Sequence, residues 1–182
     1  MEYVLHGFGV FLGVIAGVAI SLILQWYSKR RYIGQKVKNL LFELELDTKK
    51  IDLWLAEVAK LRNAVNGDSV DAWFGYFDLS KAIFVTANDM LNTGLLYEKL
   101  SHAEVEKLQQ ASWELSLSWE NSINEQLAKD KGAMMGTQGG TNRDAYRFAK
   151  SETVRHIDFW EGKMKRHKQS LEEIAVRLKK PK

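Results

Sequence analysis

The sequence contains no cysteine and only one proline, Pro181, close to the C-terminus. Without cysteine the chain has no disulfide, no Cys-ligated zinc and no thiol nucleophile. Because proline is the strongest helix breaker, its near absence leaves helices free to run long. A length of 182 residues accommodates one domain of ordinary size together with an anchor.

Catalytic signatures are missing too. The four histidines, His6, His102, His156 and His167, form no His-Glu-x-x-His pair and show no zinc-ligand spacing. There is no Gly-x-Ser-x-Gly nucleophile elbow, and no arginine stands four to six residues before a histidine, as it does in a nuclease superfamily of small helical bundles. We therefore predict no enzyme activity, no metal and no cofactor. The net charge of +3 argues against nucleic acid as a partner.

An uncharged run extends from Tyr3 to Tyr27. As a helix rising about 1.5 Å per residue it would measure roughly 37 Å, enough to cross a hydrocarbon core of about 30 Å. A cleaved signal peptide is the alternative, but the residues before the run include Glu2 and no lysine or arginine, and the apolar stretch is too long. We predict an uncleaved transmembrane anchor over residues 1–28.

The charges beside this run predict its orientation. Lys29, Arg30 and Arg31 follow it directly, so the positive-inside rule places the N-terminus outside and the rest of the chain in the cytoplasm, at a bacterial inner membrane. Trp26 and Tyr27 suit an interfacial aromatic belt. The basic cluster serves as a topology signal and could also bind anionic headgroups of the lipid bilayer.

Small residues occupy one face of the predicted anchor. Gly9, Gly13 and Gly17 are four apart and fall on one side of a helix, and Ala16 widens the groove. Membrane helices associate through close van der Waals contact, which small residues permit. Since the chain has no second membrane helix, the face predicts a homo-oligomer. The alternatives are a permissive anchor, or a groove for another subunit of a membrane complex.

A juxtamembrane stalk helix is predicted over residues 29–62, continuing the anchor. Apolar residues recur there every seven positions, with two more between them: Val37, Leu44, Ile51 and Val58, then Leu41 and Leu55. Asn66-Gly67-Asp68 is the first clear turn. Residues 63–182 then predict a cytoplasmic antiparallel helical bundle, so the fold class is all-α.

Within the bundle, one segment is dense in aromatic residues: Trp73, Phe74, Tyr76 and Phe77. Such a cluster forms core or contacts a partner. Asp78 or Ser80 could cap the helix that follows, and Ser101-His102-Ala103-Glu104 matches a capping box. The helix opened by this box is expected to carry Val105, Leu108, Leu115, Trp119, Ile123 and Leu127 on one side.

Residues 130–142 contain four glycines and predict a flexible loop, without the Gly-Lys-Ser/Thr ending of a phosphate-binding loop. The last helix is expected to begin near Asn142. Its apolar residues alternate in steps of three and four: Ile157, Trp160, Met164, His167, Leu171, Ile174 and Leu178. His167 interrupts this seam, either as a satisfied core group or as a pH-sensitive one.

An N-terminal anchor with a glycine face followed by a helical bundle resembles the small membrane effectors of bacterial antiviral systems, such as CRISPR-accessory and abortive-infection proteins. The resemblance is one of layout across the whole chain. It implies a homo-oligomeric pore or channel whose bundle controls assembly. The alternative is a non-catalytic accessory or scaffold subunit of a larger membrane complex.

Overall fold

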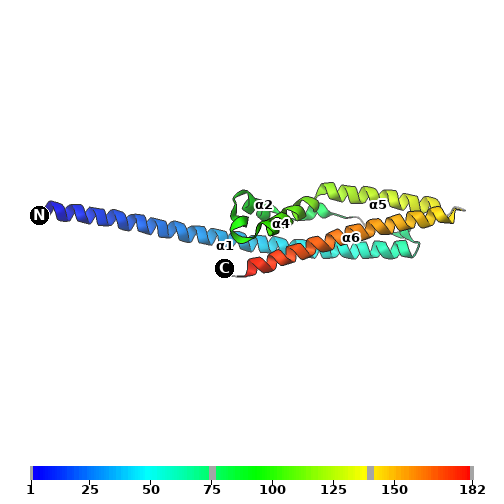
Figure 1. Ribbon diagram of the computed structural model, residues 1–182, viewed down its shortest axis with the longest axis horizontal. Helices are drawn as coiled ribbons and strands as arrows, with labels where there is room; N and C mark the ends of the chain where they lie inside the picture. Colours follow the sequence, from blue (N-terminus) through cyan, green and yellow to red (C-terminus); the bar gives the residue numbers. More distant parts are fainter. Residues whose placement is uncertain (1, 74–76, 139–141, 181–182) are drawn as a thin grey trace. The chain divides into compact units, whose positions relative to one another are not determined.

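The computed structural model is all-α, as predicted (Figure 1). It describes residues 2–73, 77–138 and 142–180, and these residues contain no strand. For residues 2–13, Ala72 and Ser80 it describes the backbone alone. The elements in chain order are α1 (Glu2–Asn66), η1 (Val70–Ala72), η2 (Leu79–Lys81), α2 (Val85–Asn92), α3 (Leu95–Lys99), α4 (His102–Glu114), α5 (Leu117–Gln138) and α6 (Arg143–Lys179).

The chain divides inside α1 into two units, Met1–Asn39 and Leu40–Lys182. This differs from the predicted boundaries after residues 28 and 62, because residues 40–66 bury side chains in the core of the second unit. Where side chains are described, no helix combines the length and the apolar character needed to cross a membrane. The predicted span begins within residues 2–13, for which the structure describes the backbone and not the side chains.

In the second unit, α6 lies antiparallel to two neighbours. Arg62 of α1 contacts Glu161 of α6, and Glu45, earlier in α1, contacts Lys179, later in α6. The α4–α5 arm, which we define as residues 102–138, lies along α6 in the same antiparallel sense (Figure 1). These contacts confirm an antiparallel helical bundle.

The buried face of α1 is only partly the predicted one. Leu44, Ile51 and Val58 are buried as expected, but Leu41 and Leu55 are only half-buried. At the intermediate positions of the repeat, the buried residue stands one position before the predicted one. A seven-residue repeat places its second apolar residue either three or four positions after the first, and the sequence did not distinguish the two. Buried residues of α1 alternate in steps of four and three: Leu40, Leu44, Asp47, Ile51, Trp54, Val58, Leu61 and Val65.

The seam of α6 agrees with the prediction. All of its predicted members from Ile157 to Ile174 are buried, and Leu178 is half-buried. The helix begins where expected, with the Asn142 side chain accepting a hydrogen bond from the backbone N–H of Ala145 at 3.1 Å. Side chains of α6 pair with both α1 and the α4–α5 arm, so α6 joins these two parts of the unit.

The capping box before α4 is confirmed. Ser101 accepts a hydrogen bond from the Glu104 N–H, and the Glu104 carboxylate accepts one from the Ser101 N–H at 2.7 Å. The single helix predicted beyond this box is instead two, because α4 ends at Glu114 and α5 begins at Leu117. Leu115, at the break, is buried and has a non-helical backbone.

The flexible loop predicted over residues 130–142 is wrong for residues 130–138, since α5 continues to Gln138. Each glycine inside a helix costs about 1 kcal/mol relative to alanine. Burial outweighs this cost, because side chains in steps of four and three enter the core through this stretch: Ile123, Leu127, Asp130 and Met134.

The predicted turn after α1 is confirmed, and it fastens three helix ends together. Asp68 has a positive φ of 53° and accepts hydrogen bonds from the Tyr146 hydroxyl at 2.5 Å and from Lys150 Nζ at 2.6 Å. Its backbone carbonyl accepts from Gln138 Nε2 at 2.8 Å. The end of α1, the end of α5 and the start of α6 therefore meet at Asp68.

Candidate functional site

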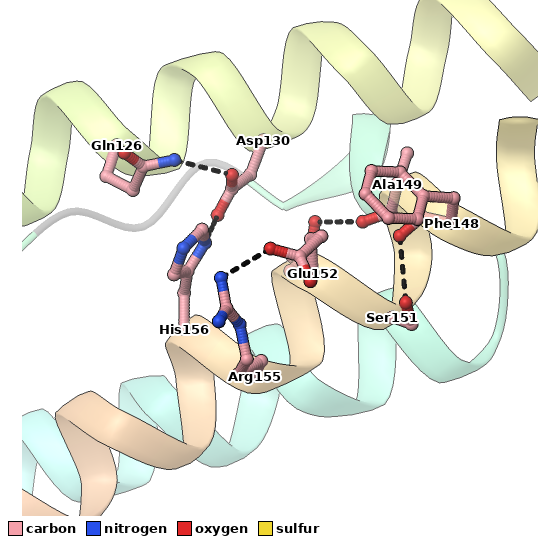
Figure 2. Close-up of polar contacts among 9 residues, drawn as sticks. Gln126, Asp130, Phe148, Ala149, Ser151, Glu152, Arg155 and His156 are labelled. Atoms are coloured by element: carbon pink, nitrogen blue, oxygen red, sulfur yellow. Dashed lines mark hydrogen bonds and ion pairs between the residues drawn. The ribbon is translucent and has the colours of Figure 1, made fainter.

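Two carboxylate–histidine pairs connect the α4–α5 arm to α6. In the first, Asp130 Oδ2 lies 2.8 Å from His156 Nδ1, and Gln126 Nε2 donates to Asp130 Oδ1 at 2.8 Å (Figure 2). Asp130 is only 7% exposed, so its two oxygens find their partners within the protein. The His156 ring stacks on Trp160 with centroids 6.0 Å apart, which holds the imidazole plane.

The second pair lies beside the break between α4 and α5. Glu114 Oε2 is 2.9 Å from His167 Nε2 and 2.8 Å from Lys163 Nζ. Gln110 Nε2 donates to the other oxygen of Glu114 at 2.9 Å. Burial raises the pKa of Glu114, but the hydrogen bonds from Lys163, Gln110 and His167 outweigh it and hold the pKa at about 2. Glu114 is therefore an ionised acceptor at neutral pH.

His167 is buried in the α6 seam, and this burial lowers its pKa, although the bond to Glu114 acts in the opposite direction. The imidazole is thus neutral at pH 7. Because ionised Glu114 can only accept, the proton sits on His167 Nε2 and is donated to Glu114. The edge of the ring meets Trp119 of α5, with centroids 6.3 Å apart.

The Ser151 hydroxyl, one turn before His156, donates to the Phe148 carbonyl oxygen (Figure 2). Among the residues whose side chains are described, no three histidine, cysteine or acidic groups converge closely enough to hold a metal ion. Each of the two pairs joins α6 to the α4–α5 arm.

A second acidic feature, missed by the sequence analysis, lies on α1. The buried Glu43 carboxylate accepts from the backbone N–H of Thr86 at 2.8 and 2.9 Å and of Ala87 at 3.3 Å, at the N-terminus of α2. Asp47, one turn later, accepts from the Ile83 N–H at 2.9 Å. Glu43 therefore caps α2 from a distant part of the chain, and Asp47 holds the residue just before the N-cap, Phe84.

Phe84 occupies the N-cap position of α2, where Asp78 or Ser80 was predicted. Asp78 accepts instead from Trp54 Nε1 at 2.8 Å, and the side chain of Ser80 lies outside the described residues. Asp47 bears a cost for its position: burial raises its pKa to about 6, and its Oδ2 is buried without a hydrogen-bond partner among the described residues. The charged form of Asp47 is therefore disfavoured by the fold.

The predicted packing and headgroup residues in the first unit are exposed wherever their side chains are described. This holds for Ala16, Gly17 and the basic cluster of residues 29–31. A Cβ atom added to Gly17 would meet nothing within 4 Å. The Arg30 guanidinium lies over the Trp26 ring, 5.3 Å from its centroid. The predictions for Gly9 and Gly13 lie outside the residues whose side chains are described.

Of the two alternatives predicted for the aromatic segment, core is the one that the structure shows for Trp73 and Phe77. Trp73 is 9% exposed and Phe77 is fully buried, with ring centroids 6.4 Å apart. Asn124 of α5 fastens Phe77 by bonding both its backbone N–H and its carbonyl oxygen. Phe74 and Tyr76 lie outside the described residues.

The position of Asp130 could have been found from the sequence. It falls in the four–three spacing of Ile123, Leu127 and Met134, a place where an acid is buried and needs a partner. Its partner His156, a distant position on another helix, carries no comparable signal. Compared with known proteins, the chain matches no family model, no curated protein and no solved structure.

Proposed function

We propose that this protein is a single-pass membrane protein that acts by assembly rather than by catalysis. Copies associate through the glycine face into a homo-oligomer of the pore type, as in the antiviral effectors with a similar layout, and the cytoplasmic bundle regulates it. One observation carries the proposal. Nine large apolar side chains of the first unit are 49–63% exposed: Val14, Ile15, Val18, Ile20, Leu22, Ile23, Leu24, Trp26 and Tyr27.

A bilayer is the partner that best suits this surface, since soluble monomers rarely expose so continuous an apolar patch. The uncharged run would reach across the hydrocarbon core. Its flank is strongly basic, with no acidic residue between Glu2 and Glu43 and five cations: Lys29, Arg30, Arg31, Lys36 and Lys38. The chain carries +3 in total, so the remainder carries +3 − 5 = −2. The basic flank thus faces anionic headgroups on the cytoplasmic side.

Self-association is supported by the surroundings of Gly17. Because a Cβ there would meet nothing within the chain, the glycine is not required by the fold of the single chain. A helix from a second copy could approach closely at this face. The substitution Gly17→Leu therefore alters the proposed contact without disturbing the bundle.

The test is the mass of the detergent-purified full chain by native mass spectrometry. We expect a closed oligomer in the wild type, and a dissociation constant at least about tenfold higher in Gly17→Leu. Ala19→Leu is the matched control, because residue 19 is rotated by about 200° from residue 17. Dye leakage from vesicles carrying the wild-type chain then tests the pore. A monomeric wild type would overturn self-association.

A scaffold role is the second candidate, favoured by aromatic and aliphatic side chains exposed on the second unit. Trp113 is 81% exposed, Phe148 and Leu53 are each 68% exposed, and Phe42 is 63% exposed. Such side chains are enriched at protein interfaces. If this role is the correct one, crosslinking in native membranes will yield complexes with other proteins, and the purified chain will stay monomeric.

A further inference from the structure

The second carboxylate–histidine pair lies at a natural point of bending. Glu114 is the last residue of α4, and Leu115–Ser116 interrupts the α4–α5 arm immediately afterwards. An acid at a helix C-terminus opposes the helix dipole, so Glu114 depends on its partners across the interface. Those partners, Lys163 and His167, both belong to α6.

A second proton on His167 would add a positive charge to a buried ring. In the neutral ring, Nε2 donates to Glu114 of α4, while Trp119 of α5 presents its ring. The charged neighbours on α6 are Lys163 and Arg166, both cationic. On the α1 side Asp52 already pairs with Lys168 at 2.6 Å. Protonation would therefore place a positive charge on a buried ring, which Glu114 favours but burial, Lys163 and Arg166 oppose.

We propose that protonation of His167 loosens the α4–α5 arm from α6, with the break at Leu115–Ser116 as the hinge. The contacts between α1 and α6 use lysine and arginine with carboxylates, so they persist over the same pH range. The arm therefore moves while the α1–α6 pair remains folded. This device belongs to the second unit and does not depend on the proposed membrane function.

The direction of the effect follows from linkage. Burial lowers the pKa of His167 below its ordinary 6.5, so the unfolded or opened chain binds a proton before the closed one does. The stabilising effect is complete above pH 6.5 and is lost as the pH falls through the lowered pKa. Glu114, with a pKa of about 2, stays ionised throughout this range.

Hydrogen exchange on the full-length protein in detergent tests the device, at pH 7.5 and pH 5.5 after correction for intrinsic exchange. We expect peptides from α4 and α5 to exchange at least about threefold faster at pH 5.5, while peptides from residues 40–66 and α6 change little. In His167→Gln the amide can still donate to Glu114 but cannot titrate, so the pH effect on α5 should disappear.

His102→Gln is the matched control, because His102 is exposed at the start of α4 and its loss should leave the pH effect intact. An unchanged pH effect in His167→Gln would overturn the proposal. If this variant fails to fold, NMR of the histidine-labelled wild type measures the pKa of His167 directly and still tests the proposal. A pKa of 6.5 or higher for His167 would then reject the device.

Discussion

On one side of α6, the contacts with α1 join strong bases to acids at the surface: Arg62 to Asp158 and Glu161, Lys168 to Asp52, and Lys179 to Glu45. On its other side, the contacts with the α4–α5 arm include both carboxylate–histidine pairs, whose acids are buried or half-buried. The two sides hold the same helix by different chemistry.

The difference determines how each side responds to pH. Burial lowers the pKa of Arg62, but the bonds to Asp158 and Glu161 outweigh burial, so the pKa is raised. The bond to Asp52 likewise raises the pKa of Lys168. These groups therefore keep their charge across neutral pH. His167, by contrast, is an imidazole whose pKa burial lowers from the ordinary 6.5. A packing interface can thus be made pH-sensitive by one buried histidine.

The largest effect should come from removing the buried acid of the first pair. Asp130→Ala leaves His156 and Gln126 without their common partner, and we expect a loss of about 1–3 kcal/mol in the free energy of unfolding. Urea unfolding of the full chain in detergent measures it. Asp144→Ala is the control, since Asp144 is exposed on α6; equal losses in both variants would contradict the importance of burial.

A smaller effect of opposite pH dependence is expected on α1. The raised pKa of Asp47, about 6 against an ordinary 3.8, means that its contribution is fully present below pH 3.8 and is lost as the pH rises through 6. Asp47→Asn should therefore gain stability relative to the wild type between pH 5 and pH 8, by about 1.4 kcal/mol. Thermal unfolding at several pH values measures this gain.

Asp52→Asn is the matched comparison for this experiment, because Asp52 lies on the same helix but is exposed. The free energy of unfolding of Asp52→Asn, relative to the wild type, should not change over the same pH range. A flat profile for Asp47→Asn would show that burial of the carboxylate at position 47 does not disfavour its charge.

The smallest effect is predicted for the exposed side of α6. Arg62→Ala removes two ion pairs, yet solvent screening limits the loss of unfolding free energy to about 0.5–1 kcal/mol. The loss should be the same at pH 5.5 and pH 8. A loss that varies with pH would contradict the contrast between the two sides, and added salt should reduce it.

Local signals in the sequence were sufficient for several elements. The capping box at Ser101, the turn at Asp68 and the start of α6 at Asn142 each depend on residues within one turn of one another. The seam of α6 was predictable for a similar reason, since apolar spacing of three and four fits one helical face. The loop prediction for residues 130–138 was wrong because glycine propensity was weighed without burial.

By itself, the sequence determined an all-α chain, the helical seam of α6, and the continuous apolar run beside a basic flank, because these follow from composition and local periodicity. Only the tertiary structure decided which register of α1 is buried, that Glu43 caps α2 while Asp47 binds the Ile83 N–H, and that Asp130 and Glu114 meet histidines on α6. These pairings join residues 26 to 53 positions apart. No local preference encodes such distant partners, so the packing of whole helices selects them.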